Sequence, residues 1–442
     1  MQEKPDNRKR AENFSRRDFL KASAAVGTAT LVSRRAVAKG SDKIRVGLIG
    51  CGDRGTGAGI IHCAESSEGV ELVAMGDLFQ DQMDRARRAI PGNLKKRNLP
   101  VDEIYKVTPE RIFVGFDAYE KVLACDVDMV ILTAPPYFRP KHFRAAVEAG
   151  KHVFVEKPIA VDPAGVRSFI ETSERARAKG LTVVAGTQMR RARHIMAAME
   201  RIHNGDIGEV LGGQCVRCGG AMLNWRRAER KRRPEWSDME WQIRRWLFVT
   251  WLSGDFIVEM HVHNLDLINW AMQSPPVQCM ALGGRQVRTA PECGNIFDHC
   301  AAEYEYPNGV RIQYLGSQID GASTRNDIRL VGTKGRGYVD FARMAIEGEK
   351  PFQYDGPAPR PVVQEYADMI ASIREGKAIN EGRQVAESTL TAIMGRMSAY
   401  TGQVVTWKWL MEASKSDLSP ETVKFGPLPM QPVAVPGVTK LV

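Results

Sequence analysis

Between residues 43 and 187 the chain alternates short apolar runs with amphipathic, helix-like stretches. The apolar runs are rich in β-branched residues and occupy residues 43–49, 71–75, 127–132 and 151–155. Uninterrupted apolar runs of this length are typical of parallel strands that helices cover on both faces. The pattern therefore predicts a doubly wound α/β domain, in which the polar stretch 90–113 is an inserted connection.

After residue 300 the pattern changes to a strict alternation of apolar and polar positions. It is clearest in residues 301–306, 310–314 and 327–331, which predict strands with one buried face. The turn Pro307-Asn308-Gly309 predicts a hairpin between the first two of these strands. Residues 365–400 contain helical segments that we expect to pack back on the body. The proline-rich residues 417–442 predict an irregular tail.

The N-terminus carries an export motif. Ser15-Arg16-Arg17-Asp18-Phe19-Leu20-Lys21 resembles the twin-arginine signal, and Ala36-Val37-Ala38 has the A-x-A pattern of a cleavage site. The weakly apolar run between them, residues 22–32, is too short to span a bilayer, which needs about 20 residues. We interpret residues 1–38 as a signal peptide for the twin-arginine translocase. It predicts a periplasmic or otherwise exported protein without stable membrane insertion, the alternative being a disordered basic tail.

The chain behind the leader is only mildly basic. The leader carries nine of the 62 basic and four of the 52 acidic residues, so its removal lowers the net charge from +10 to about +5. We interpret the basic run at residues 226–233 as a solvated segment, because no nucleic-acid-binding motif accompanies it. Cys215-Val216-Arg217-Cys218 has no second pair at zinc spacing. We therefore predict neither a nucleic-acid partner nor a structural metal.

A glycine-rich turn directly follows the first predicted strand. Residues 50–55 have the pattern G-x-G-x-x-G, and a helix is predicted over residues 58–63. The first glycine permits the tight turn, the second lets the backbone approach a pyrophosphate, and the third allows close packing of helix and strand. Because the helix N-terminus then faces the anion, this placement predicts a dinucleotide site. Its candidate residues are Gly50, Gly52, Asp53, Arg54 and Gly55.

Asp77 ends the second predicted strand, 22 residues after the last glycine of the turn. This is close to the spacing of the acid that binds the adenosine ribose hydroxyls in dinucleotide-binding domains. A carboxylate at this place repels a 2′-phosphate, and no arginine follows directly, so we favour NAD over NADP. The alternative for Asp77 is a helix N-cap.

The residues from the third strand onward resemble the glucose–fructose oxidoreductase, inositol dehydrogenase and MocA family. The resemblance rests on Ala134-Pro135-Pro136, His142, Ala149-Gly150-Lys151-His152-Val153, Glu156-Lys157-Pro158, Gly205-Asp206-Ile207-Gly208-Glu209 and Tyr400-Thr401-Gly402. It implies a Rossmann domain, taken here as residues 39–187, followed by an α/β domain with a large open, mostly antiparallel sheet, taken as residues 188–416. It also implies an active site between the halves and homo-oligomers formed through the sheets.

By position, the resemblance adds further cofactor-binding candidates and one catalytic residue. The cofactor-binding candidates are Thr133, Pro135, Pro136, His142, Glu156, Lys157 and Gln188. Lys157 is implied to lie between the nicotinamide ribose and the reacting carbon. Its ammonium group at the end of a strand is suited to stabilise developing alkoxide charge, the alternative being a surface salt bridge.

A second polar segment lies at residues 255–270. Read as one helix, it places Asp255, Glu259, His263, Asp266 and Trp270 on one stripe. The family has D-x-x-x-H-x-x-D here, which implies His263 as the general base, with Glu259 in place of the first aspartate. Whether Glu259 orients His263 or contacts substrate stays open. The alternatives are a structural histidine, or a metal site made by Glu259, His261 and His263, which the family does not use.

The substrate side is marked by five of the eight tryptophans, at positions 225, 236, 241, 246 and 251. Indole rings stack on the apolar faces of sugar rings, so Trp246 and Trp251 are substrate candidates; a buried cluster that pins an insertion explains them equally well. Arg190 (or Arg191), His261 and Asp298 are further polar candidates for the cleft.

Together these features predict an exported, NAD-dependent oxidoreductase that acts on a ring hydroxyl of a sugar, glycoside or related polyol. Because free nicotinamide cofactor is not expected outside the cytoplasm, we infer that the cofactor leaves with the folded protein and stays bound. A redox-neutral glycosidase or lyase, which oxidises, eliminates and re-reduces, is the close alternative. A second is a sugar-binding protein that holds a nucleotide and does no chemistry.

Overall fold

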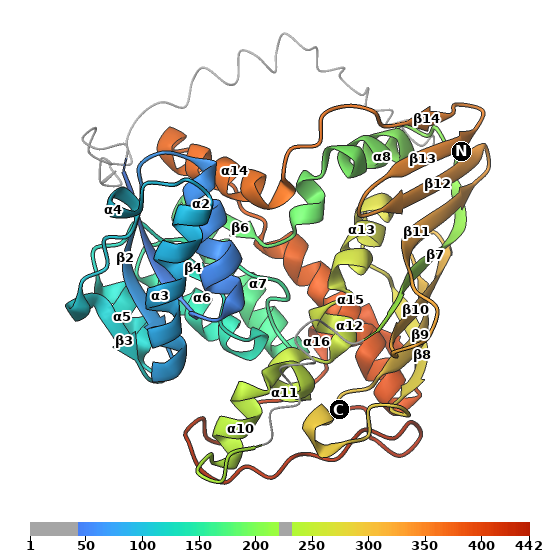
Figure 1. Ribbon diagram of the computed structural model, residues 1–442. Helices are drawn as coiled ribbons and strands as arrows, with labels where there is room; N and C mark the ends of the chain where they lie inside the picture. The colour runs from blue at the N-terminus through green and yellow to red at the C-terminus, as the bar shows by residue number, and fades with distance from the viewer. Residues whose placement is uncertain (1–42, 221–231) are drawn as a thin grey trace, which may run out of the picture. The chain divides into compact units, whose positions relative to one another are not determined.

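The computed structural model describes residues 43–220 and 232–442. The signal peptide, Trp225 and residues 226–231 of the basic run lie outside the described residues. Lys43–Val442 form one unit, in which two sheets are each covered by helices (Figure 1).

The first sheet has six parallel strands in the order β3-β2-β1-β4-β5-β6. The strands are β1 (Ile44–Ile49), β2 (Val70–Asp77), β3 (Ile112–Val114), β4 (Met129–Leu132), β5 (His152–Val155) and β6 (Val183–Ala185). Nearly every residue of β1, β4 and β5 is buried, as the uninterrupted apolar runs predicted. The order reverses at β1, so β1 and β4 flank the switch point where α/β sheets bind ligands.

Helices cover both faces of this sheet. They are η1 (Gly55–Gly59), α2 (Ile60–Ser66), α3 (Gln80–Lys96), α4 (Val101–Ile104), η2 (Pro109–Arg111), α5 (Ala118–Ala124), η3 (Pro136–Phe138), α6 (Arg139–Glu148) and α7 (Pro163–Ala178). One core joins the sheet to α2, α3 and the late helix α14 (Pro361–Glu375), and a second joins it to α5, α6 and α7. The late helix α14 therefore completes the first domain.

The interpretation of residues 90–113 as an inserted connection was wrong. Helix α3 extends to Lys96 despite Pro91, and Ile112–Val114 form strand β3, paired with β2. The polarity that suggested an insertion has a simple cause. Only Met83, Ala86, Ile90 and Leu94 of α3 are buried, so most of the helix faces away from the core.

The second sheet has nine strands in the order β14-β13-β12-β11-β7-β10-β9-β8-β15. They are β7 (Val210–Gly219), β8 (Gln278–Gly284), β9 (His299–Glu305), β10 (Arg311–Gln318), β11 (Arg325–Gly332), β12 (Gly335–Asp340), β13 (Met344–Gly348), β14 (Phe352–Gln353) and β15 (Val405–Thr406). The strand pairs are antiparallel except β7 with β10, and the predicted hairpin joins β9 to β10. The predicted large, open, mostly antiparallel sheet is confirmed.

The remaining helices cover one face of the second sheet and connect the two halves. They are η4 (Gln188–Arg191), α8 (Arg193–His203), α10 (Asp238–Arg244), η5 (Trp246–Phe248), α11 (Thr250–Ser253), α12 (Phe256–Glu259), α13 (Val262–Met272), η6 (Pro291–Cys293), α15 (Gly382–Thr401) and α16 (Trp407–Glu412). The long helix α15 contacts α7 of the first half and β8 and α13 of the second. Residues 417–442 form no helix or strand, as predicted.

Candidate active site

The glycine-rich turn has the tight geometry that its sequence predicted. Gly50 adopts φ +96°, and a Cβ there would lie 2.5 Å from the backbone nitrogen of Ala134. A Cβ at Gly55 would lie 2.2 Å from the carbonyl oxygen of Gly50. A Cβ at Gly52 would meet nothing within 4 Å, so the turn is open on the side where a pyrophosphate approaches. Thr133 fixes the neighbouring strand end, because its Oγ1 donates to the carbonyl of Gly50 at 2.5 Å.

Asp77 lies beside this turn at the end of β2. Its carboxylate accepts hydrogen bonds from the backbone N–H of Cys51, at 2.6 Å, and of Phe79, at 2.9 Å. Burial raises the pKa of Asp77, and the two N–H donors oppose that shift. The acid is thereby aimed at the mouth of the glycine turn, where the adenosine ribose of a dinucleotide lies.

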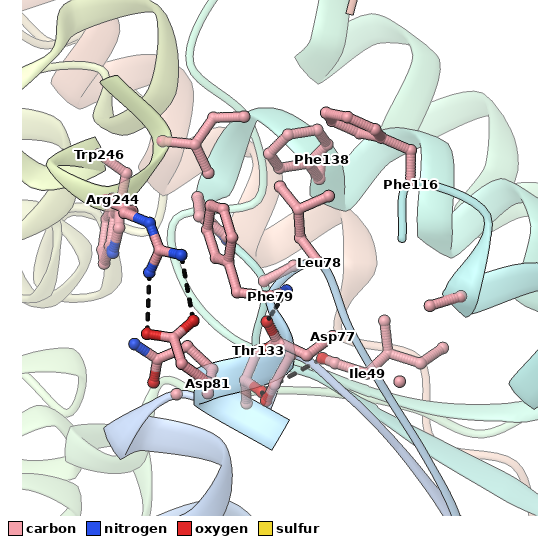
Figure 2. A pocket seen from close by; sticks show the side chains of 18 of the residues that line it. Ile49, Asp77, Leu78, Phe79, Asp81, Phe116, Thr133, Phe138, Arg244 and Trp246 are labelled. Carbon is pink, nitrogen blue, oxygen red and sulfur yellow. Dashed lines mark hydrogen bonds and ion pairs between the residues drawn. The ribbon is translucent and has the colours of Figure 1, made fainter. Parts of the chain in front are cut away.

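A cavity of about 1040 Å³ lies along this edge of the first sheet (Figure 2). From the first half it is lined by predicted cofactor residues: Gly50, Gly52, Asp53, Arg54, Asp77, Thr133, Pro135 and His142. From the second half it is lined by the segment from Arg233 to Phe248, which includes Trp236, Trp241, Arg244 and Trp246. The cavity is the size of a cofactor site.

His142 supplies an independent sign that this cavity is built for a ligand. Its ring stacks on Tyr119 at 4.3 Å between centroids, and its buried Nδ1 has no hydrogen-bond partner. Burial lowers the pKa of His142 to about 3, so the imidazole is neutral at ordinary pH. With the open glycine turn and the carboxylate of Asp77, the described residues fit a nicotinamide dinucleotide.

Lys157 lies at the carboxyl end of β5, outside the lining of this cavity. Its Nζ donates to the backbone carbonyl of Glu259 at 2.6 Å and to the Glu259 carboxylate at 3.2 Å. Both side chains are about one-tenth exposed, with relative exposures of 12% and 10%. Burial lowers the pKa of Lys157, and the charge of Glu259 opposes this. Glu259 therefore contacts the lysine.

The prediction of one helix over residues 255–270 was wrong. Helix α12 ends at Glu259 and α13 begins at Val262. The last carbonyls of a helix lack helical partners, and here two cations bind them: Lys157 at Glu259, and Arg217 of β7 at the carbonyl of Met260, at 2.7 Å. The sequence contains no glycine or proline that marks this break.

His263 follows the break as the second residue of α13 and is buried. Burial and then the charge of Lys157 hold the pKa of His263 well below its usual range. The imidazole of His263 is therefore neutral and able to accept a proton. The structure thus brings Lys157, just after β5, into contact with Glu259, and His263 lies four residues after Glu259, beyond the α12–α13 break.

Because of this break, Asp255 and Asp266 of the predicted polar stripe do not lie on one face with Glu259 and His263, and each has other partners. Asp255 caps α12 and accepts from the backbone N–H of Phe297 at 2.9 Å, inside the core. Asp266 forms a two-pronged ion pair with Arg190, with both N–O distances at 2.9 Å, and Arg190 also lies over the ring of Trp270. The guanidinium of Arg190 is thus held by Asp266.

Several other candidates do not line this cavity. His261 is 2% exposed, and its Nδ1 lies 2.5 Å from the hydroxyl of Tyr314 in the core. Asp298 is fully buried and accepts three backbone N–H bonds from residues 286–288. Trp251 is buried and donates to Gln242 at 2.8 Å, so it belongs to the cluster that pins the insertion, whereas Trp246 lines the cavity.

Three further candidates for cofactor binding do not line the cavity. Glu156 is buried and pairs with the Nε of Arg54 at 2.5 Å. Pro136 is buried at the start of η3. The side-chain oxygen of Gln188 is buried without a hydrogen-bond partner. Within the described residues no three His, Cys, Asp or Glu side chains gather as metal ligands, so the proposed set of Glu259, His261 and His263 is not assembled.

Two arginines that the sequence analysis did not identify as candidates donate to backbone carbonyls around the site. Arg217 donates to the carbonyl of Met260 at the break between α12 and α13. Arg139, fully buried in the first turn of α6, donates to the carbonyls of Ala134 at 2.9 Å and Pro158 at 2.5 Å. Burial lowers the pKa of Arg139 to about 10. It ties the loop after β4 to the loop after β5, but its sequence neighbourhood gives no sign of this.

Comparison with known families agrees with this geometry. Residues 44–187 match an oxidoreductase family with an NAD-binding Rossmann fold, and residues 195–337 match the GFO/IDH/MocA C-terminal domain. The chain belongs to the GFO/IDH/MocA oxidoreductase family. The resemblance inferred from the sequence is confirmed, and so is the nicotinamide-binding Rossmann half.

This family member carries an export signal. Residues 13–33 match the signal sequence of the TAT (twin-arginine translocation) pathway, which confirms the predicted route. No helix within residues 43–220 and 232–442 is long and apolar enough to cross a membrane.

Solved structures of similar fold include an aldose oxidoreductase and several inositol dehydrogenases. Aldose-aldose oxidoreductase from Caulobacter crescentus is 17% identical, with a TM-score of 0.63 over 82% of this chain and 99% of that one. Myo-inositol 2-dehydrogenase from Lactobacillus plantarum is 18% identical, with a TM-score of 0.58 over 82% and 99%. At these identities the likeness concerns the fold.

Curated relatives in sequence include glycosyl hydrolase family 109 proteins. Those of Shewanella sp. (strain W3-18-1) and Shewanella baltica (strain OS155) are each 29% identical over 228 residues, 46% of this chain and 46% of theirs. The chain spans about half the length of the curated relatives it matches.

Proposed function

We propose that this protein oxidises a ring hydroxyl of a sugar, glycoside or related polyol with a nicotinamide cofactor that it retains between turnovers. The observation that carries the proposal is the buried ammonium group of Lys157, held by Glu259 at the carboxyl end of β5, together with the neutral His263 four residues after Glu259. A cation and a proton acceptor at one point are what the oxidation of an alcohol requires from side chains.

Each of the two residues has a distinct part. A bound nicotinamide cofactor supplies the acceptor for a hydride. His263 takes the hydroxyl proton, for which a neutral imidazole is suited. Lys157 uses two of its three N–H donors on Glu259, and its third donates to the substrate oxygen and stabilises negative charge there. Glu259 and the α12–α13 break position that ammonium group.

NAD is the favoured cofactor. Its adenosine ribose hydroxyls are suited to hydrogen-bond the carboxylate of Asp77, which is aimed at the glycine turn. The same carboxylate repels the 2′-phosphate of NADP. The next residues, Leu78 and Phe79, supply no positive charge to balance that phosphate.

Export supports a retained cofactor. A protein that leaves the cytoplasm folded takes with it what it has bound, and the compartment beyond, which we take to be the periplasm, is not expected to supply free nicotinamide cofactor. Retention requires that the cofactor be regenerated on the enzyme, either by a second substrate or by return of the hydride to the first product.

The second candidate function follows from that last possibility. Oxidation of a ring hydroxyl acidifies the neighbouring C–H, which permits elimination of an aglycone before the hydride returns. The match to glycosyl hydrolase family 109 proteins favours such a redox-neutral glycosidase. A nucleotide-holding, non-catalytic binding protein is disfavoured because both Lys157 and His263 are present.

We also propose that the open face of the second sheet joins copies of the chain. Met280, Leu282 and Leu315 point outward from β8 and β10 and are each at least half exposed, at 56%, 58% and 50%. Strands β8 and β10 lie on either side of β9, and Leu282 and Leu315 both pair with Ala301 of β9, so the three strands present one apolar area that no helix of the described residues is seen to cover. Exposed areas of this kind are characteristic of subunit interfaces.

The proposed function is tested with chromogenic glycosides and free sugars, each mixed with the purified chain without added cofactor. Oxidation predicts a rise in absorbance at 340 nm of up to one reduced cofactor per chain, abolished by His263→Asn. The glycosidase predicts aglycone release over many turnovers with no net reduced cofactor. If the wild-type chain shows no turnover with any substrate and so does not differ from His263→Asn and Lys157→Met, the binding-protein alternative is favoured.

A further inference from the structure

The cavity beside the glycine turn has a cover that does not belong to the Rossmann half. Helix α10 and η5 line it opposite the ends of β2 and β3, and Figure 2 shows Arg244 joined to Asp81 and next to Phe79. In an open α/β sheet the crevice at this edge is where a dinucleotide enters and leaves. Asp77 marks the end that holds the adenosine ribose, so the cover lies over the adenosine half.

Arg244, the last residue of α10, fixes the cover to α3. Its two terminal nitrogens lie 3.0 and 3.1 Å from the two carboxylate oxygens of Asp81. The guanidinium also lies over the rings of Phe79, at 3.8 Å, and Trp236, at 4.8 Å. A two-pronged ion pair combined with stacking is directional, so Arg244 holds α10 in one position against the first half.

The C-terminal tail fixes the same cover from the other side. The N–H of Leu428 donates to Asp238 at 3.0 Å, and the N–H of Met239 donates to the carbonyl of Gly426 at 3.1 Å. Phe425 contacts the rings of Phe79 and Phe116, with centroids 5.9 and 5.0 Å apart. Three segments distant in sequence thus converge on the adenosine end of the cavity.

We propose that α10 and the tail form a latched cover over the adenosine half of the cofactor site, with the Arg244–Asp81 pair as its latch. The inference rests on the proposed function, because it explains how an exported enzyme keeps its cofactor. The cofactor leaves only when Arg244 separates from Asp81 and Phe79, so the opening of the cover sets the rate of release. Arg244 and Asp81 act on cofactor retention and not on the chemical step.

The test measures cofactor release directly. The full chain is loaded with NADH and mixed with excess NAD⁺, and the loss of energy transfer from protein tryptophan to NADH gives the dissociation rate. Arg244→Gln and Asp81→Asn are each expected to raise that rate about tenfold, the scale of a lost ion pair and cation–π contact. Because the two residues form one latch, the double variant is expected to release no faster than the faster single variant.

A matched control and a second contact complete the design. Arg343→Gln is the control. It also removes the positive charge of an arginine, but the ion-pair partner of Arg343 is Asp340, in the second sheet. This variant is expected to leave the dissociation rate of NADH unchanged. Phe425→Ala is expected to accelerate release, because the tail then no longer covers Phe79 and Phe116. Asp81 is 63% exposed at the side chain, so the Asp81→Asn chain is expected to fold.

Each outcome decides between distinct ideas. Rates equal to the wild type in both latch variants overturn the cover while leaving the proposed oxidoreductase intact. If the increase in dissociation rate of the double variant equals the product of the increases of the two single variants, Arg244 and Asp81 act independently, which also overturns the latch. A wild-type chain that binds neither NADH nor NAD⁺ overturns the proposed function itself, and with it this inference.

Discussion

Replacement of Lys157 by methionine separates the structural role of the lysine from its catalytic role. The ammonium donates to the carbonyl and the carboxylate of Glu259, and both side chains are about 90% buried. Removing one partner of a buried pair leaves the other charge unpaired, which costs about 3–5 kcal/mol of folding free energy. Loss of a donor to the developing oxyanion costs on the order of 10²–10³ in kcat, about 2.7–4 kcal/mol.

The double variant Lys157→Met/Glu259→Gln distinguishes the two costs. Neutralising the carboxylate removes the unpaired buried charge, so the free energy of unfolding should recover to within about 1–2 kcal/mol of the wild type. The rate of substrate-dependent cofactor reduction should not recover, because no donor to the substrate oxygen has been restored.

Urea unfolding followed by tryptophan fluorescence measures stability, and single-turnover absorbance at 340 nm measures the chemical step. Lys179→Met is the matched control, since Lys179 donates to the carbonyl of Val147 at 2.8 Å, away from the site. The reasoning is refuted if Lys157→Met keeps most of the wild-type rate, or if the double variant regains rate and stability together.

Three further predictions follow from particular side chains. Asp77→Ser should raise the ratio of NADP to NAD affinity about tenfold or more, because a carboxylate next to a 2′-phosphate is removed; equilibrium titration with both cofactors checks this. Burial and Arg360, which donates to His62 at 3.0 Å, lower the pKa of His62 to about 4. The unfolded chain therefore binds the extra proton below about pH 6.5, so stability should fall as the pH drops from about 6.5 to 4, and His62→Gln should flatten that part of the urea-midpoint profile. Leu282→Glu should lower the molar mass seen by light scattering if the open sheet face joins subunits, and an unchanged mass with intact secondary structure would exclude that face.

Local signals were sufficient for much of the fold. The strands of the first sheet follow from uninterrupted apolar runs such as Val46–Ile49, and the glycine turn from the steric needs of Gly50 and Gly55. Asp77 could be predicted as the ribose-binding acid because one β-α-β unit sets the number of residues between the glycine turn and that acid. These features are visible in short segments of the sequence, although the backbone that Gly50 approaches belongs to Ala134.

What the sequence did not reveal depends on contacts between distant residues. The break within residues 255–270 is a place where Lys157, just after β5, and Arg217 of β7 donate to the carbonyls of Glu259 and Met260. Arg244 and Asp81 meet although 163 positions separate them. Whether Asp298 and His261 point into a cleft or into the core is likewise a property of packing, and periodicity along one element does not encode it.

The central claim, a cofactor held between turnovers, is tested most directly by denaturing the purified mature chain and quantifying the nucleotide that it releases. The account predicts close to one NAD or NADH per chain, retained through dilution and gel filtration of the native protein. Chains that are purified empty and bind added NAD rapidly and reversibly would contradict it, and would describe an ordinary dehydrogenase that draws on free cofactor.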